Sequence, residues 1–352
     1  MNFFGSFNVF CLLAVMLSTG QGLTWNPLGQ RATKTSPKTV AITGSTGLVG
    51  SALTERLLAK GHSVRRLTTG KVPKETKGLN EIWYKWDPSR GSLDASAFAG
   101  CDAVVHLAGE NIASGSWDNP PFSLLGAWSE KKKGLIMSSR VQGTRCVVDT
   151  LNKMDRPPRV LVSASAVGYY GFSKVSATRI FSEEFGQGDG FLAEVAREWE
   201  REALKCRVRT VCARFGVVLS AKGGVLGKLL PLFKLAAGGN LGSGQQGFSW
   251  VSIDDAVSAI EFAIDNNSLR GPVNVCSPEP ADNAAFTRAL AKAVNRPAIV
   301  PVPEVVGSFL FGQFGDEVLF GGQKAKPAKL LAAGFKFDQP ELESSISKQL
   351  EK

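Results

Sequence analysis

The chain has 352 residues, of which 43% are hydrophobic and 20% charged, so it can bury a full core and is not disordered in composition. Its formal net charge is +10, but the basic residues are scattered, and the one tight run, at 131–133, follows a glutamate. We therefore expect a solvated surface and no nucleic-acid partner. Six cysteines without CxxC spacing and two distant histidines, His62 and His106, predict buried free thiols in a reducing compartment and no metal site.

Residues 1–38 are predicted to be a targeting leader. VFCLLAVML, at residues 9–17, is an apolar run too short to span a bilayer and suited to the h-region of a signal peptide. Residues 21–38 then carry basic and hydroxyl side chains but no acid, and the first acidic residue of the chain is Glu55. This two-part pattern is typical of leaders that direct proteins to plastids of secondary origin. A plain secretory signal is the alternative, and we expect no transmembrane span in the mature chain.

Residues 39–61 predict a strand, a glycine-rich turn and a helix. The β-branched run 39–43 is followed by Gly44, Gly47 and Gly50, and Gly61 ends an apolar helical pattern. Glycines let the backbone turn tightly and approach a pyrophosphate, to which the helix N-terminus offers free N–H groups. The pattern indicates a dinucleotide-binding turn, with a purely structural turn as the alternative.

Further apolar runs alternate with helical segments along the chain. We predict strands at residues 82–87, 103–109, 159–165, 209–216, 272–277 and 299–303. Such runs indicate a parallel sheet covered on both faces, an α/β fold of the Rossmann doubly wound type. We expect a Rossmann domain at 39–220, completed by later elements, and a smaller C-terminal substrate-side region at 221–352. Residues 115–127, with two prolines, are predicted to be a loop insertion.

The end of the second strand favours NADP(H) over NAD(H). NAD-binding proteins place an acid there to hold the ribose hydroxyls, but this chain has no acid between Glu55 and Glu75. The strand instead ends in Thr68 and Thr69, with cations at positions 65, 66 and 71. Hydroxyls and cations suit a 2′-phosphate. The alternative is that the two arginines are ordinary surface charges.

Several long motifs point to a family. TGSTGLVG, HLAGENIASG, SSRVQGT, SASAVGYYG, FLAEVAREWE, RFGVVLS, LGSGQQGFSWVSIDD and PAKLLAAGFKF occur in this order between residues 39 and 346. Together they resemble the atypical extended short-chain dehydrogenase/reductases known as epimerase family proteins, the SulA-like group. The resemblance implies a Rossmann domain that binds NADP(H) and a C-terminal region that binds a small-molecule substrate of unknown identity. Plant relatives are plastid proteins linked to plastid division, which agrees with the leader.

The resemblance also implies individual cofactor contacts. The pyrophosphate would meet the turn and the start of its helix, at Gly44, Ser45, Thr46, Gly47, Leu48 and Val49. Thr68 and Thr69 would meet the adenosine phosphate, and Leu107 and Ala108 would line the adenine and ribose. Arg140 would lie beside the nicotinamide, and Val218 would touch the far end of the cofactor.

Tyr170 and Lys174 have the spacing of the Tyr-x-x-x-Lys pair, in which the lysine lowers the pKa of a proton-donating tyrosine. In the extended family, however, that tyrosine lies on a long helix well after the serine that ends the fifth strand, here Ser165. Tyr170 follows Ser165 directly, and the glycines on either side of Tyr170, at positions 168 and 171, disfavour a continuous helix. We therefore predict that Tyr170 and Lys174 are not the catalytic pair.

The positions that correspond to the catalytic pair hold Phe191 and Val195, which form an apolar stripe with Trp199. Without the phenol, a proton donor would come from Ser165 or Tyr169, which we name as tentative catalytic residues. Further donor candidates are Ser163, Tyr170 and Glu110, and packing roles are the alternative for all of them. Two functions remain open: a plastid NADP(H)-dependent oxidoreductase or epimerase-like enzyme, and a non-catalytic NADPH-binding regulator, possibly of plastid division.

Overall fold

The computed structural model describes residues 36–73, 78, 80–113, 128–173 and 179–351. Seven strands form a central sheet in which every neighbouring pair is parallel. Their spatial order is β3 (Glu81–Lys85), β2 (Ser63–Thr68), β1 (Thr39–Thr43), β4 (Ala103–His106), β5 (Val160–Ala166), β7 (Arg209–Phe215) and β11 (Gly271–Val275). The order reverses between β1 and β4, so the predicted Rossmann doubly wound sheet is confirmed.

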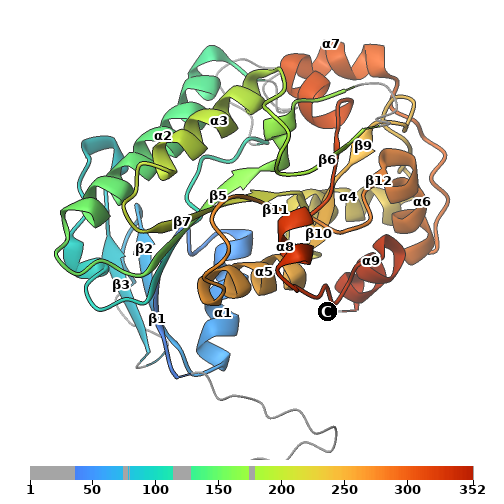
Figure 1. The fold of residues 1–352 in the computed structure, drawn as a ribbon. Coiled ribbons are helices and arrows are strands. Elements are labelled where there is room, and N and C mark those ends of the chain that lie inside the picture. Colours follow the sequence, from blue (N-terminus) through green and yellow to red (C-terminus); the bar gives the residue numbers. More distant parts are fainter. Residues whose placement is uncertain (1–35, 74–77, 79, 114–127, 174–178, 352) are drawn as a thin grey trace, which may run out of the picture. The chain divides into compact units, whose positions relative to one another are not determined.

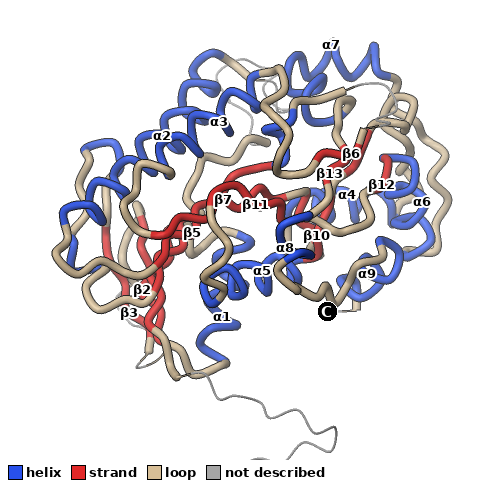
Figure 2. The backbone as a smooth tube through the Cα atoms, viewed as in Figure 1, coloured by secondary structure: helices blue, strands red, loops and turns tan. Residues whose placement is uncertain are grey.

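Helices cover both faces of this sheet (Figures 1 and 2). α1 (Leu48–Ala59) and α5 (Ile253–Asp265) lie on one face, and α2 (Glu130–Lys153) and α3 (Phe191–Ala203) lie on the other. Successive strand residues point to opposite faces. In β1, accordingly, Val40 and Ile42 pack in the apolar cluster of α1 and α5, while Ala41 packs in the cluster of α2.

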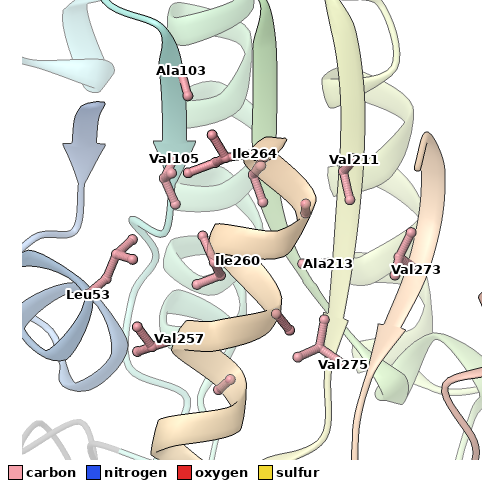
Figure 3. Packing of buried hydrophobic residues seen from close by; sticks show 14 of the residues in the cluster. Leu53, Ala103, Val105, Val211, Ala213, Val257, Ile260, Ile264, Val273 and Val275 are labelled. Carbon is pink, nitrogen blue, oxygen red and sulfur yellow. The ribbon is translucent and has the colours of Figure 1, made fainter. Parts of the chain in front are cut away.

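The larger apolar core lies between α5 and the strands. Figure 3 shows Val257, Ile260 and Ile264 of α5 pointing toward the sheet, where they meet side chains such as Val105 and Val211. The three α5 residues are spaced three and four apart, so they form one helical face. Through this face a helix from beyond residue 220 packs against the central sheet.

The C-terminal part of the chain adds a third apolar cluster. It joins Leu226 and Phe233 of α4 to Phe286 of α6 and Ile346 of α9, around the buried Trp250. The remaining helices are α4 (Gly224–Lys234), α6 (Asn283–Ala293), α7 (Glu304–Phe314), α8 (Ala328–Ala332) and α9 (Leu342–Leu350). The short strands are β6 (Ile180–Phe181), β8 (Val217–Leu219), β9 (Gly247–Phe248), β10 (Trp250–Ser252), β12 (Ala281–Asp282) and β13 (Lys324–Ala325). Single turns are η1 (Pro88–Arg90), η2 (Ala95–Ala97), η4 (Val167–Tyr170) and η5 (Gly315–Leu319).

The strand predicted at residues 299–303 is wrong. Within it, Val302 makes an isolated bridge to Leu241, and Ile299 is 74% exposed. Prolines at positions 297, 301 and 303 cannot donate the backbone hydrogen bonds of a strand. The apolar run therefore resembles a buried strand in composition but cannot pair as one.

Some predictions fall on residues that the structure does not describe: nearly all of the leader, the loop insertion at 115–127, and Lys174. Residues 37–352 form one compact unit, and the boundary at residue 220 stays a prediction. Among the described helices, none is both long and apolar enough to cross a membrane.

Candidate functional site

The turn between β1 and α1 is packed so closely that it requires glycine. Gly44 has φ +64°, and a Cβ there would lie 2.7 Å from the carbonyl carbon of Leu107. A Cβ on Gly50, in the first turn of α1, would lie 2.2 Å from the carbonyl oxygen of Gly44. At Gly47 a Cβ would make a tight contact of 3.3 Å with the carbonyl oxygen of Gly44, but no other described atom would lie within 4 Å, so there is space on the remaining side of the turn. The glycines thus bring α1 against the end of β4 and keep one side of the turn open.

Polar groups at the turn lack partners. Gly47 is the N-cap of α1 and has no side chain that could accept a hydrogen bond from the first N–H groups of the helix. The hydroxyl of Ser45 is buried, with 1% exposure of the residue, and has no hydrogen-bond partner among the described residues. A helix N-terminus favours an anion, and an unpaired buried hydroxyl is unfavourable unless a ligand binds it. The donor set at residues 44–49 therefore fits the pyrophosphate predicted for it.

The end of β2 lies beside the turn, because Leu67 pairs with Thr43 of β1. Thr68 is the last residue of β2, and its hydroxyl accepts a hydrogen bond from the backbone N–H of Gly70 at 3.1 Å. Thr69 is exposed. The two threonines predicted to meet the adenosine phosphate therefore lie at the carboxyl edge of the sheet, where such a ligand binds in this fold.

Arg66 connects β2 to the turn, a contact that the sequence did not reveal. Its guanidinium donates hydrogen bonds to the carbonyl oxygen of Ser45 at 2.7 Å and to the carboxylate of Glu81 at 2.8 Å. It also lies over the ring of Trp83, 4.1 Å from the centroid. Its buried Nε has no partner in the described part of the chain. Arg66 therefore lies at the predicted phosphate end as one member of an ion pair with Glu81 and is not a free surface charge.

The end of β4 is fixed by a neutral histidine. His106 is fully buried, with Nδ1 2.7 Å from the hydroxyl of Thr43 and Nε2 3.1 Å from that of Thr144. Burial lowers the pKa of His106 to about 4, so the ring is uncharged at neutral pH. The hydroxyl of Thr43 also accepts a hydrogen bond from the backbone N–H of Ala108 at 3.3 Å. These bonds hold Leu107 and Ala108 against the glycine-rich turn.

Arg140 lies on α2 next to the residues that follow β4. Its Nη1 donates to the carbonyl oxygens of Glu110 at 3.1 Å and Ile136 at 3.2 Å, and its guanidinium carbon lies 5.0 Å from the ring centre of Trp199. A Cβ on Gly109 would lie 3.2 Å from the same guanidinium. Burial lowers the pKa of Arg140 to about 10, so it stays positively charged at neutral pH. The indole N–H of Trp199 has no partner among the described residues.

Ser165, a predicted catalytic residue, takes part in a buried ion-pair network. Its hydroxyl donates to Oε1 of Glu200 at 2.6 Å, and Glu200 accepts hydrogen bonds from Nε of Arg214 at 2.6 Å and Nη2 at 2.7 Å. Burial alone would lower the pKa of Arg214, but the hydrogen bonds and charge of Glu200 raise it above its ordinary value. Ser163, also buried, donates to the carbonyl oxygen of Ala164 at 3.3 Å.

Tyr169 and Tyr170 extend the same network from η4. The phenol of Tyr170 donates to Asn274 at 2.8 Å and accepts from Arg214 at 3.0 Å, and burial raises its pKa to about 12. Tyr170 is thus held in the core and stacks on Phe181. Tyr169 is half-buried, and the guanidinium carbon of Arg214 lies 3.6 Å from its ring centre.

The positions that correspond to the Tyr-x-x-x-Lys pair lie on α3, as predicted. Phe191 begins the helix and packs edge-on against Trp128, with ring centres 5.3 Å apart, while Val195 is 3% exposed. The carboxylate of Glu317 accepts hydrogen bonds from the backbone N–H groups of Phe191 at 2.9 Å and Leu192 at 3.0 Å. A residue from beyond α7 therefore closes the start of α3, and apolar side chains fill this part of the site.

Val218 lies in β8, opposite Val251 of β10. A Cβ on Gly224 would lie 3.3 Å from both the carbonyl oxygen of Val218 and a methyl group of Leu48. Val218 is therefore brought close to the start of α1. Its contact with a cofactor stays a prediction, as do the catalytic roles of Ser165 and Tyr169.

A metal site and a surface groove are two other kinds of site that a chain of this fold can carry. No group of three or more His, Cys, Asp or Glu residues that could hold a metal ion occurs in the described ranges. A surface groove of about 960 Å³ lies along the second half of α2, where Arg145, Asp149 and Lys153 line it. None of the predicted site residues borders this groove.

Comparisons with known proteins agree with the geometry. The sequence profile of the NAD dependent epimerase/dehydratase family matches residues 40–276, and that of a domain of unknown function, DUF1731, matches residues 302–348. An epimerase family protein from Mycobacterium bovis is 42% identical over 301 residues, which cover 85% of this chain and 93% of that protein. A chloroplastic homologue of epimerase family protein SDR39U1 from Arabidopsis thaliana is 39% identical over 313 residues, which cover 86% of this chain and 84% of that protein.

A solved structure is also similar. The crystal structure of human epimerase family protein SDR39U1 with NADPH matches with a TM-score of 0.76 and 32% identity, over 89% of this chain and 99% of that chain. The family profile begins in β1 and ends just after β11, so it spans the whole central sheet. The chain therefore belongs to the NAD-dependent epimerase/dehydratase family.

Proposed function

We infer that this chain is an NADPH-binding protein that has kept the cofactor site of extended dehydrogenases without their acid–base pair. The observation that carries the inference is the state of Ser165. Its hydroxyl is buried and donates at 2.6 Å to Glu200, which in turn is bound by Arg214. A serine whose proton is held by a buried carboxylate is part of the core and is not available to a substrate.

Three features support the cofactor. The turn at residues 44–49 offers the helix N-terminus and the unpaired hydroxyl of Ser45 to a pyrophosphate. Arg66, which is paired with Glu81, lies at the end of the site where NADPH carries its 2′-phosphate, and no acid occurs between the end of β2 and Glu75. The human relative was solved with NADPH.

A titration of residues 37–352 with NADPH and NADH by calorimetry tests this proposal. We expect NADPH to bind more tightly, and Thr68→Asp to weaken NADPH binding by about tenfold while sparing NADH, since a carboxylate repels the 2′-phosphate. Ser344→Asp adds the same charge at an exposed position of α9 and should change neither affinity. Equal affinities for the two cofactors, or tighter binding of NADH, would contradict the proposal.

A plastid is the proposed location, and regulation of plastid division the proposed context. The two-part leader pattern and the chloroplastic relative from Arabidopsis support the location. Residues 1–40 fused to a fluorescent protein should reach a plastid in a suitable host. Secretion of the fusion to the medium would instead indicate a plain signal peptide.

An NADP(H)-dependent enzyme is the second candidate function, and Tyr169 is the observation that favours it. This phenol is half-buried, and its ring lies 3.6 Å from the guanidinium carbon of Arg214, which also binds the partner of Ser165. The cofactor, when bound, would supply or accept a hydride. Tyr169 would then hold the proton that accompanies it. In that case Tyr169→Phe would lower turnover and leave NADPH affinity unchanged.

A further inference from the structure

Residues 304–320, which contain α7 and η5, form a helical hairpin that we call the C-terminal cover. α7 is interrupted at Gly312, where φ is +54°, and the chain turns back there. A Cβ on Gly307 would lie 2.0 Å from the ring of Phe320, so the start and the end of the hairpin are in close contact and a larger residue than glycine does not fit between them. The C-terminal cover is therefore packed against itself.

Glu317, within the C-terminal cover, holds the start of α3. The residue is 8% exposed, and its carboxylate accepts hydrogen bonds from the backbone N–H groups of Phe191 and Leu192. The side chain of Gln313 donates to the same carboxylate at 2.8 Å. Gly190, the N-cap of α3, has no side chain that could take this place, and a Cβ there would lie 3.3 Å from the carboxylate. The first N–H groups of α3 therefore find their acceptor in the C-terminal cover.

Three aromatic rings pack beside this contact. The ring of Trp128 packs against Phe191 and Phe314, with ring centres 5.3 Å and 5.5 Å away. Phe314 belongs to the C-terminal cover and is 6% exposed. Lys133, near the start of α2, donates to Gln313 at 3.3 Å, and Figure 1 shows α7 next to α2 and α3. The C-terminal cover therefore closes onto the starts of both helices through apolar rings.

The aromatic rings border the place where the nicotinamide is expected. Phe191 stands where relatives carry a proton-donating tyrosine, which must reach the reacting ring. Trp199, on the same stripe of α3, lies against Arg140, the residue expected beside the nicotinamide. A Cβ on Gly168, in η4 after β5, would lie 3.9 Å from Cβ of Leu192. The start of α3 is therefore at the carboxyl edge of the sheet, where the ligand binds in this fold.

We propose that the C-terminal cover shields the reduced nicotinamide of bound NADPH from solvent, and that Glu317 is the positioning residue that holds the cover closed. This inference rests on the proposed function and gives a physical reason for it. A closed apolar cover excludes water and keeps dissolved hydride acceptors away from the ring. The profile of the domain of unknown function begins at residue 302, so its first part would have this role.

A purely structural role for Glu317 is the alternative, because a carboxylate at a helix N-terminus stabilises the helix wherever it occurs. The two roles differ in what the loss of the carboxylate exposes. A structural cap lowers stability alone, whereas a residue that holds a cover also opens the bound nicotinamide to solvent.

Quenching of NADPH fluorescence by acrylamide measures this exposure. Residues 37–352, one compact unit, are mixed in excess with NADPH and excited at the absorption band of the reduced nicotinamide, where tryptophan does not absorb. For the wild type we expect a quenching rate constant, corrected for fluorescence lifetime, well below that of free NADPH. Glu317→Ala and Phe314→Ala should each raise it severalfold and speed NADPH release. Glu317→Gln keeps one carbonyl acceptor and should give an intermediate value.

Asp282→Ala is the matched control. The side chain of Asp282 caps α6 by accepting from the backbone N–H of Ala285 at 2.7 Å. Its loss removes a carboxylate from another helix N-terminus, so the thermal unfolding midpoint should fall while the quenching constant stays that of the wild type. If the alanine variants of the C-terminal cover do not fold, Glu317→Gln and Phe314→Leu are the milder changes, and each should still raise the constant.

The outcomes separate this inference from the proposed function. Bound NADPH that is quenched as readily as free NADPH in the wild type would overturn the inference alone, since the cofactor would still be bound. Wild-type quenching in all folded variants of Glu317 and Phe314 would also overturn it and leave Glu317 as a helix cap. Absence of NADPH binding by the wild type would overturn both.

Discussion

Two regions at the carboxyl edge of the sheet differ in whether their buried polar groups have hydrogen-bond partners. At the glycine-rich turn, the hydroxyl of Ser45 and Nε of Arg66 have no hydrogen-bond partner among the described residues, and no side chain caps α1. At the end of β5, the hydroxyl of Ser165 donates to Glu200, and Arg214 binds both Glu200 and Tyr170. The first region is complete only with a ligand, while the second is completed by the protein itself.

This difference separates cofactor binding from proton transfer. Buried polar atoms are nearly always paired, so unpaired atoms beside a helix N-terminus indicate where a ligand places its own polar atoms. Paired atoms in an ion-pair network indicate structure instead. Two atoms near the second region are exceptions among the described residues: the indole N–H of Trp199, which is unpaired beside Arg140, and Oε2 of Glu183, which is unpaired although its Oε1 accepts from the backbone of Asn274. Arg140 is therefore the residue through which the second region is expected to contact the cofactor.

The largest expected effect comes from breaking the network at its centre. Arg214→Leu leaves Glu200 buried without its cation, so the free energy of unfolding should fall by about 3–5 kcal/mol. Urea unfolding measures this. Arg159→Leu is the control, because Arg159 pairs with Asp102 while 74% exposed, and its loss should cost less than about 1 kcal/mol. Similar small losses in both variants would show that the network does not stabilise the core.

A pH effect is expected from His106, beside the turn. Burial lowers its pKa in the folded state to about 4. A group whose folded pKa is depressed stabilises the protein above its unfolded pKa of about 6.5, and this stability is lost as the pH falls toward 4. Through His106 the free energy of unfolding should therefore fall by about 3 kcal/mol between about pH 7 and pH 4. His106→Asn should remove this part of the acid sensitivity. Urea unfolding at each pH gives the free energy of unfolding of both proteins, and the same pH dependence in wild type and variant would contradict this account.

Filling the open side of the turn should abolish binding and leave the fold intact. Gly47→Val places methyl groups where the pyrophosphate would lie, so NADPH affinity should fall by on the order of a hundredfold or more. Gly134→Val on α2 is the matched control, because a Cβ there meets no atom within 4 Å. Calorimetric titration compares the two. Wild-type affinity in Gly47→Val would place the ligand elsewhere.

A smaller effect is expected at Arg140, which joins the two regions. Arg140→Ala should weaken NADPH binding by about 1–3 kcal/mol if the guanidinium makes a charge-assisted contact. Arg145→Ala, on the same helix, removes a half-exposed cation that pairs with Glu202 and should not change the affinity. If both variants bind NADPH like the wild type, Arg140 holds only the carbonyl oxygens of Glu110 and Ile136.

The sequence predicted the fold and the strand–turn–helix at residues 39–61 because both depend on local patterns. Apolar runs indicate the strands, and glycines at fixed spacing indicate the turn, so the sheet and the tight turn at Gly44 were identified correctly. The prediction at residues 299–303 was wrong because composition alone does not show that prolines prevent pairing and that Ile299 is exposed.

The network was not predictable in the same way. Glu200 lies in a helix rich in charges, FLAEVAREWEREA, where nothing in the spacing marks it as the buried acid. Its partner Arg214 is on a strand. Glu317 lies more than 120 residues along the chain from the backbone N–H groups at the start of α3 that donate hydrogen bonds to it. Such pairs arise from tertiary packing. Spacing predicted that Tyr170 is too close to β5 to occupy the catalytic position, and in the structure Tyr170 is buried in the core.

The fate of bound NADPH tests the central claim most directly. Residues 37–352 are saturated with NADPH, pooled aldehydes, ketones and nucleotide sugars are added, and the absorbance of the reduced nicotinamide is followed. The account predicts that NADPH binds and stays reduced, with the same trace for wild type, Ser165→Ala and Tyr169→Phe. Steady oxidation by the wild type that is lost in Tyr169→Phe, at unchanged NADPH affinity, would contradict it and identify an enzyme with a rebuilt proton donor.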